Sequence, residues 1–339
     1  MDPTNPVRVG VLGAGSFGTC LAILSSELGH SVTLWARDAT VVKAINRHHR
    51  NPRYLTEFRI PESVRATDEI EAAVSEQDLV LSVVPSHAVR ETWKLAVAAL
   101  NPETLIVSGT KGIEVGTGQL MSESLRGLLP PECHPRIVVL SGPSFSREIA
   151  DGRPTAVSLA CPNDSFAIAT QTLLSSRRFR CYTNPDVVGV ELGGALKNVV
   201  AIAVGICDGL NLGQNARAAL ITRGLTEMTR LGTAMGANPM TFLGLSGIGD
   251  LVLTCTGDLS RNRRVGIAIG EGRALDDILA GLHQVAEGVR TTRSAYELAG
   301  KHQVEMPITE SVYRVLYEGL DPREAVASLT ARQLRSELD

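Results

Sequence analysis

The sequence predicts an α/β protein in two parts: a doubly wound, mostly parallel sheet in residues 1–188 and an all-helical domain in residues 189–339. Three observations predict this division. The length of 339 residues suits two domains better than one. Apolar runs of strand length alternate with helical patterns as far as about residue 188. Helical patterns alone follow one another after that point.

The composition excludes several classes of protein. With 44% apolar and 20% charged residues, it is typical of a soluble globular protein, and the net charge of −3 gives no reason to expect nucleic acid as a partner. The six cysteines form no C-x-x-C pair, which predicts reduced core thiols. The seven histidines form no metal-ligand pattern, so no metal site is expected. Because the first residues are polar and the first apolar run is short, we expect no signal peptide and a cytoplasmic protein.

A glycine-rich turn organises the first part. The β-rich run Val7–Leu12 leads directly into GAGSFG, which spans residues 13–18, and then into a helical pattern that ends near Gly29. A second strand is predicted at Ser31–Trp35. Because G-x-G-x-x-G lies here between a strand and a helix, it predicts a Rossmann-type dinucleotide site.

Each glycine of this turn has a predicted role. Gly13 permits the tight turn, Gly15 lets a pyrophosphate reach the backbone, and Gly18 lets the helix pack closely on the strand. The helix N-terminus then offers free N–H groups and a partial positive charge to the phosphates.

Two residues after the second strand bear on the choice of cofactor. An acidic residue here takes the ribose 2′-hydroxyl of NAD, whereas an arginine accepts the 2′-phosphate of NADP. Both types are present, as Arg37 and Asp38. Because Arg37 lies closer to the strand, we expect NADP to be used, with NAD also tolerated.

Further strands continue the pattern. Their near-continuous apolar content is typical of strands covered on both faces. They are predicted at Asp78–Val84, Leu105–Ser108, Ile137–Leu140, Ala156–Ala160 and Arg178–Tyr182, with helices at about 86–100, 118–129 and 164–175. Because parallel strands share one carboxyl edge, Lys111 is expected to face the dinucleotide. The alternative is an ordinary loop lysine.

The second part is predicted to contain helices only. They are expected at 190–209, about 214–235, about 239–244, 261–269, 275–281, 288–301, 308–317 and 322–328. The first of these is small or apolar at nearly every position except Lys197 and Asn198, which predicts a helix buried on most sides. A buried ammonium loses its hydration, so Lys197 is a candidate functional residue; the alternative is a lysine that extends to the surface. The segment looks too short and too interrupted to span a membrane.

Two later stretches carry reactive chemistry. Asp250 lies in a glycine-rich, apolar segment, where it is either a helix N-cap or a functional carboxylate, and the two roles are compatible. The stretch SRNRR, residues 260–264, places three arginines at an expected helix start. Arginine binds phosphate through a rigid fork and a helix N-terminus favours anions, which predicts an anion site. The alternative is a solvated helix face.

Eight motifs occur along the chain in a characteristic order and at characteristic separations: GAGSFG, LWARD, GTKGIE, SGPSF, ELGGALKNVVAIAVGICDGL, GLSGIGDLVLTCT, SRNRRVG and VAEGVRT. In both respects the chain resembles the bacterial NAD(P)-dependent glycerol-3-phosphate dehydrogenases. The resemblance covers almost the whole chain. It implies a cytoplasmic, commonly dimeric enzyme that uses NAD or NADP. It also implies reduction of dihydroxyacetone phosphate to sn-glycerol 3-phosphate for phospholipid synthesis, with no stable membrane insertion.

The resemblance also implies a role for each matching position. Lys197 is the catalytic acid/base, Asp250 is its partner, and Lys111 lies between cofactor and substrate. Other implied cofactor contacts are Ser16, Phe17, Arg37, Ser146, Arg261, Val285 and Glu287, and other implied substrate contacts are Gly142, Ser144, Ser260, Arg261 and Asn262. Burial and the charge of Lys111 are expected to lower the pKa of Lys197, whereas Asp250 is expected to raise it. The sequence leaves open which effect is larger.

Two other functions stay open at this point. One is a related two-domain dehydrogenase of a 3-hydroxyacid or a phosphorylated sugar acid, in which SRNRR is not expected. The other is a non-catalytic dinucleotide sensor of the same fold, which would give Lys197, Asp250 and Lys111 no role.

Overall fold

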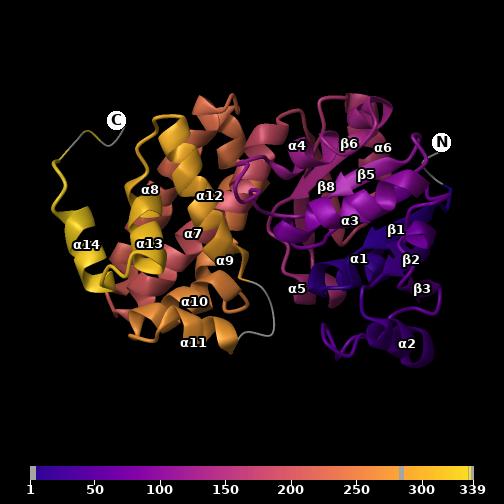
Figure 1. Cartoon of the computed structure of the whole chain (residues 1–339), viewed down its shortest axis with the longest axis horizontal. Helices are drawn as coiled ribbons and strands as arrows, with labels where there is room; N and C mark the ends of the chain where they lie inside the picture. The colour runs from indigo at the N-terminus through magenta and orange to yellow at the C-terminus, as the bar shows by residue number, and fades with distance from the viewer. Residues whose placement is uncertain (1–4, 282–285, 335, 337–339) are drawn as a thin grey trace.

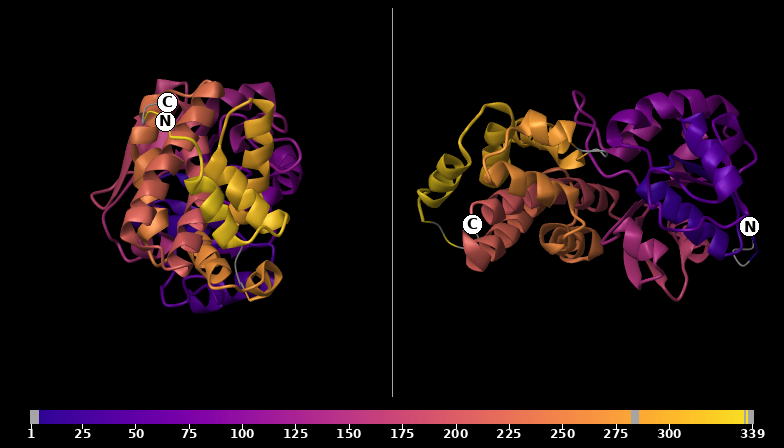
Figure 2. Two further views of the ribbon diagram at one scale, coloured as in Figure 1. Left: turned by 90° about the vertical axis from the view of Figure 1, so that its left-hand side faces the viewer. Right: turned by 90° about the horizontal axis from the view of Figure 1, so that it is seen from below.

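The computed structural model describes residues 5–281, 286–334 and 336. An eight-stranded sheet with helices on both faces forms one half of the molecule, and helices form the other (Figure 1). Seen from below, the two halves lie side by side along the long axis (Figure 2).

The sheet follows the order β3-β2-β1-β4-β5-β6-β7-β8. Its strands are β1 (Arg8–Leu12), β2 (Ser31–Trp35), β3 (Val64–Thr67), β4 (Leu79–Ser82), β5 (Leu105–Ser108), β6 (Ile137–Ser141), β7 (Thr155–Ala160) and β8 (Phe179–Asn184). All neighbouring strands pair in parallel except β6 and β7. The prediction of a doubly wound, mostly parallel sheet is confirmed. β1 lies between β2 and β4, where the winding direction reverses and such sheets bind ligands.

Two apolar layers hold the helices on the sheet. One face packs against α1 (Ser16–Glu27), α2 (Ala39–His48), α5 (Ser146–Ala150) and α6 (Asp164–Leu174). The other face packs against α3 (Val89–Ala96), α4 (Met121–Arg126) and the short 3₁₀ turns η1 (Glu71–Ala73), η2 (Ser86–Ala88), η3 (Val97–Ala99) and η4 (Pro131–Arg136). All six cysteines are buried free thiols, as expected of core residues.

Some elements differ from the prediction. The sequence did not predict β3, a four-residue edge strand whose burial alternates, or the helices α2 and α5. The helix expected at 118–129 is shorter, spanning Met121–Arg126. Gly118 has a left-handed φ of 70°, and Leu120 forms a β-bridge with Ile113, so the chain enters the helix only after them.

The described residues of the second half form helices joined by loops, with no strand among them. Its elements are α7 (Val187–Gly209), α8 (Gly213–Ala234), η5 (Pro239–Leu243), the π-turn η6 (Leu245–Gly249), α9 (Asp250–Thr256), α10 (Arg261–Gly270), α11 (Leu275–Ala280), α12 (Glu287–Lys301), α13 (Pro307–Tyr317) and α14 (Pro322–Thr330). The all-helical prediction is confirmed for these residues. The predicted helices did not include α9, although the N-cap alternative for Asp250 placed the start of a helix there.

Helix α7 is the central element of this half and also contacts β6 and β7 of the sheet. The expectation that it is too short for a membrane span is wrong on length, because its 23 residues and its apolar composition would suffice. However, 94% of its most apolar window is buried inside the protein, which is typical of a core helix.

Glycines set the spacing between α7 and α10. A Cβ on Gly205 would lie 2.1 Å from the carbonyl oxygen of Arg263, and one on Gly266 would lie 2.1 Å from that of Ile202. The two backbones therefore touch, and α10, which begins with the arginine-rich stretch, is held at a fixed distance from Lys197.

Candidate active site

The glycine turn has the geometry of an anion cradle. Gly13 has a φ of 113°, a conformation that favours glycine, and its N–H donates to the carbonyl of Trp35. A Cβ on Gly18 would lie 1.7 Å from the carbonyl oxygen of Gly13, so only glycine fits there. A Cβ on Gly15 would meet nothing within 4 Å, and no side chain caps the N-terminus of α1. These features fit a pyrophosphate bound to the backbone.

Two other residues predicted for the cofactor lie directly beside this cradle. Ser16 and Phe17 begin α1, and the Phe17 ring lies where a Cβ on Gly109 would meet it at 3.0 Å. Arg37 follows β2 and is exposed, and Ser146 is the first residue of α5. Val285 lies outside the described residues.

Lys197 is buried and paired. Only 7% of the residue is exposed, so it does not extend to the surface. Its Nζ donates to Oδ1 of Asp250 over 2.5 Å and to Oγ1 of Thr254 over 2.7 Å. The alternative of a surface-seeking lysine is therefore wrong.

Asp250 also accepts from a second lysine. Its Oδ2 lies 2.6 Å from Nζ of Lys111, which follows β5 at the carboxyl edge of the sheet. The same ammonium donates to the carbonyl of Gly142 and to Oγ of Ser144, which follow β6. The structure therefore brings Lys197, Asp250, Lys111, Gly142 and Ser144 together, although they come from both halves of the chain.

Asp250 is not a helix N-cap. The N-cap of α9 is Gly249, and Asp250 is the first helical residue, with its carboxylate directed to the two lysines. The N-cap alternative is therefore wrong, because η6 runs directly into α9 and Asp250 already has a helical conformation.

Burial decides the pKa of Lys197. Removal from water favours the neutral amine and lowers the pKa to about 8, although Asp250 favours the charged form. Repulsion from Lys111 contributes to this lowering of the pKa. Burial therefore outweighs the opposing effect of the carboxylate, a balance that the sequence left open, and a pKa of about 8 suits a group that exchanges protons near neutral pH.

Thr254 is a site residue that sequence reasoning missed. Its hydroxyl accepts from Lys197 and donates to the backbone carbonyl of Asp250, one turn earlier on α9. The sequence signal that could have found Thr254 was its spacing of four residues from Asp250. This spacing places two side chains on the same face only if the segment is a helix.

The three arginines of the stretch at residues 260–264 have different surroundings. Arg261 is partly buried and reaches Oγ of Ser16 at 3.4 Å, beside the glycine turn, and no carboxylate pairs with it among the described residues. Arg263 is paired with Asp208, whereas Arg264 is exposed. One guanidinium of the three therefore faces the cradle, and the alternative of a solvated face applies to Arg264.

The polar neighbours of Arg261 are engaged within the protein. Ser260 caps α10 by accepting from the N–H of Arg263. The amide of Asn262 donates to Oδ1 of Asn198 and accepts from the N–H of Gly288. Asn262 thus ties α10 to α7 and α12 in addition to any contact with substrate.

Glu287 links the helical half to the sheet. At the start of α12, its carboxylate accepts from the hydroxyl of Ser86 over 2.7 Å and from the N–H of Ser86 over 3.3 Å. Ser86 lies just beyond the carboxyl end of β4, so Glu287 sits at the edge where the cradle lies.

Two family models match the two halves of the chain. Residues 8–167 match the family described as the N-terminus of NAD-dependent glycerol-3-phosphate dehydrogenase, and residues 186–327 match its C-terminus. A glycerol-3-phosphate dehydrogenase [NAD(P)+] of Myxococcus xanthus is 53% identical over 98% of this chain and 99% of its own length. The glycerol-3-phosphate dehydrogenase [NAD(P)+] of Syntrophotalea carbinolica is 51% identical over 98% of this chain and 100% of its own length.

A solved structure shows the same architecture. The crystal structure of glycerol-3-phosphate dehydrogenase from Coxiella burnetii is 43% identical, with a TM-score of 0.91 over 96% of this chain and 99% of that one. D-mandelate dehydrogenase in complex with NADH, at 13% identity and a TM-score of 0.62, is similar in fold alone. The two family matches and the full-length relatives agree, and the chain belongs to the NAD-dependent glycerol-3-phosphate dehydrogenase family.

Proposed function

We propose that this protein reversibly reduces dihydroxyacetone phosphate to sn-glycerol 3-phosphate with NADH or NADPH. The observation that carries the mechanism is Lys197, a buried amine with a pKa lowered to about 8 and held by Asp250 and Thr254 beside a dinucleotide cradle. The direct test is loss of NADPH absorbance when dihydroxyacetone phosphate is added to the purified protein. A cofactor that binds while no ketone is turned over would support a dinucleotide sensor instead.

The glycine turn, Ser16 and Phe17 would hold the nicotinamide cofactor. When bound, the cofactor supplies the hydride that reduces C2 of the substrate. Arg37 is proposed to accept the 2′-phosphate of NADP, with NAD also used. Ser146, Lys111, Arg261, Glu287 and Val285 are the other proposed cofactor contacts.

Lys197 is proposed as the general acid. The ammonium stabilises the negative charge that develops on the C2 oxygen and donates a proton to it, and in the reverse direction the neutral amine accepts the hydroxyl proton. Asp250 and Thr254 fix the direction of the Nζ atom, because each takes one of its hydrogens. The low exposure of Lys197 keeps bulk water from competing for that proton.

The substrate is proposed to lie between two groups of residues. Arg261, Ser260 and Asn262 would hold the phosphate, and Lys111, Gly142 and Ser144 would line the side of the sheet. Anchoring the phosphate orients the carbonyl toward Lys197, and fixed orientation supplies much of the rate. The alternative of a 3-hydroxyacid or sugar-acid dehydrogenase receives less support, because the two full-length relatives described above are named glycerol-3-phosphate dehydrogenases.

The proposal also covers the location, oligomeric state, metabolic role and domain division of the protein. We expect a cytoplasmic homodimer whose product supplies glycerophospholipid synthesis, without nucleic acid or stable membrane partners. We also propose a domain division at residues 188 and 189, two residues into α7. Light scattering of the purified protein tests the dimer.

A further inference from the structure

Asn51 is fully buried although it lies in the loop between α2 and β3. Its Nδ2 donates to the carbonyl of Ala14 and to Oγ1 of Thr19, each over 2.9 Å. Its Oδ1 accepts from the N–H groups of Arg53 and Tyr54 over 3.0 and 3.1 Å. Both donor hydrogens and both acceptor positions of this amide are therefore used.

The first pair of bonds reaches the glycine turn itself. Ala14 stands between Gly13 and Gly15, and Thr19 lies in the first turn of α1. In a trans peptide the carbonyl and the following N–H point in opposite directions. Holding the Ala14 carbonyl toward Asn51 therefore directs the Gly15 N–H to the other side, and that N–H has no acceptor among the described residues.

The same loop is attached at two further points beside the cradle. Arg53 forms an ion pair with Asp38, the neighbour of Arg37. Glu57 forms one with Arg147, the neighbour of Ser146. Residues 51–58 are thus fastened to the turn after β1, to the end of β2 and to α5.

We propose that Asn51 is a positioning residue for the dinucleotide. It orients the Ala14–Gly15 peptide toward the phosphates and holds residues 51–58 along the cradle. This inference rests on the proposed function, because it requires the glycine turn to be the cofactor site. It predicts an effect on cofactor binding that is separate from the chemical step.

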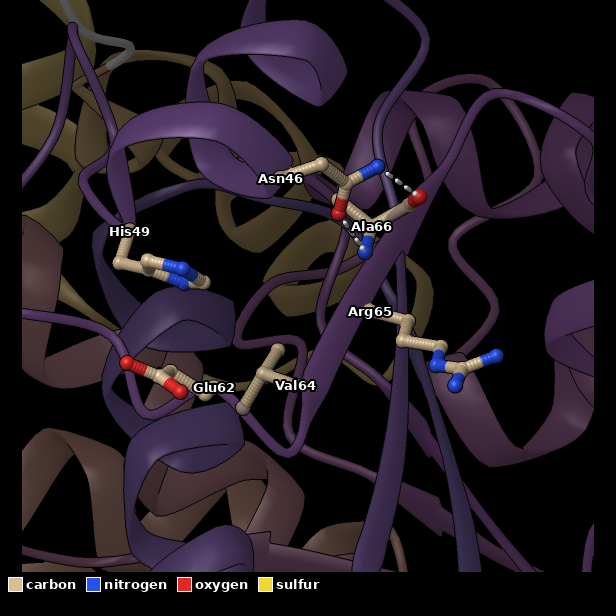
Figure 3. Close-up of a pocket in the computed structure, with 6 residues that line it drawn as sticks. All are labelled: Asn46, His49, Glu62, Val64, Arg65 and Ala66. Atoms are coloured by element: carbon tan, nitrogen blue, oxygen red, sulfur yellow. Dashed lines mark hydrogen bonds between the residues drawn. The ribbon is translucent and has the colours of Figure 1, made fainter.

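Asn46 provides a control in the same region of the fold, although it is exposed and makes two such bonds where Asn51 makes four. It also binds backbone in both directions, since its Nδ2 donates to the Ala66 carbonyl and its Oδ1 accepts from the Ala66 N–H, each over 2.9 Å (Figure 3). These bonds fasten α2 to the edge strand β3, beside a pocket of about 360 Å³ that includes His49, Glu62 and Arg65. Asn46→Ala therefore removes a similar pair of bonds without touching the glycine turn.

The test compares Asn51→Ala with Asn46→Ala in the full-length protein. Dissociation constants for NADH and NADPH are measured by fluorescence titration, and kcat and the KM for dihydroxyacetone phosphate by steady-state kinetics. For Asn51→Ala we expect both dissociation constants to rise by a common factor of about ten, the size of a lost buried hydrogen bond. We expect kcat and the substrate KM to stay within about twofold of wild type. Asn46→Ala should leave both dissociation constants unchanged.

Thermal melting establishes that each variant is folded. If Asn51→Ala does not fold, the Thr19→Val variant provides the test. This substitution removes the hydroxyl that accepts from the Asn51 amide and keeps the shape of the side chain. A smaller rise in both dissociation constants is then expected.

Three outcomes would overturn the inference: unchanged cofactor binding in the deciding variant, an equal rise in Asn46→Ala, or a rise for NADPH alone. Wild-type protein that binds neither cofactor would instead overturn the proposed function.

Discussion

Asp250 holds Lys197 through one carboxylate oxygen, over 2.5 Å, and its other oxygen lies 2.6 Å from Nζ of Lys111. Lys111 follows a strand of the sheet, whereas Lys197 and Asp250 lie on helices of the other half. One carboxylate, only 1% exposed, therefore joins the two halves at the proposed reaction centre. It offsets part of the desolvation of two ammonium groups.

Removal of the proposed acid should affect the chemical step. For Lys197→Ala we expect kcat to fall by on the order of 10²–10⁴, the range for a general acid or base. Cofactor affinity should be retained, because Lys197 is not part of the glycine turn. Steady-state kinetics and a separate NADPH titration check this, and near-normal turnover would refute the assignment.

The two reaction directions should have opposite pH dependence. Lys197 is charged below its pKa of about 8 and neutral above it. Since reduction requires the charged form, kcat/KM for dihydroxyacetone phosphate should fall as pH rises through about 8, whereas kcat/KM for glycerol 3-phosphate should rise.

Asp250→Asn should shift both of these limbs to lower pH. The carboxylate raises the pKa of Lys197, so its removal lowers that pKa further. Profiles measured in both directions with saturating cofactor test the assignment, and limbs that do not move in Asp250→Asn contradict it.

Arg261 should distinguish phosphorylated from unphosphorylated substrate. Loss of a hydrogen bond to a charged group predicts a fall of about 10- to 100-fold in kcat/KM for dihydroxyacetone phosphate in Arg261→Ala. Because the guanidinium also reaches Ser16, the KM for the cofactor should rise as well. Unphosphorylated dihydroxyacetone serves as the comparison, and an equal loss toward it would contradict the phosphate role.

Asp208 should matter for stability rather than for chemistry. Its carboxylate pairs with both Arg217 and Arg263, and its side chain is 10% exposed. Asp208→Ala leaves two partly buried guanidinium groups without this partner, so we expect the free energy of unfolding to fall by about 3 kcal/mol. Urea denaturation measures it. The exposed neighbour Arg264 gives the control, since Arg264→Ala should change stability by less than about 0.5 kcal/mol.

Arg37 should influence the choice of cofactor. If its guanidinium binds the 2′-phosphate, Arg37→Ala will lower kcat/KM with NADPH by about tenfold or more and leave NADH little changed, because only NADPH carries that group. Kinetics with both cofactors in both proteins provide the measurement. An unchanged ratio would remove Arg37 from the explanation of cofactor preference.

The sequence by itself determined the parts of this protein that depend on local patterns. Apolar runs placed seven of the eight strands, the glycine spacing located the cradle, and the small residues around Lys197 indicated a buried helix. It missed β3, α5 and α9, which have only four, five and seven residues, and it also missed the ten-residue helix α2.

Only the tertiary structure decided how distant groups meet. Asp250 joins lysines 139 and 53 residues away, Thr254 enters the site because α9 follows a π-turn, and Asn51 reaches Ala14 across 37 residues. Such contacts depend on packing between elements, which no local spacing encodes. The pKa of Lys197 follows the same rule, because burial and two opposing charges act on it together and their balance is fixed only when the chain has folded.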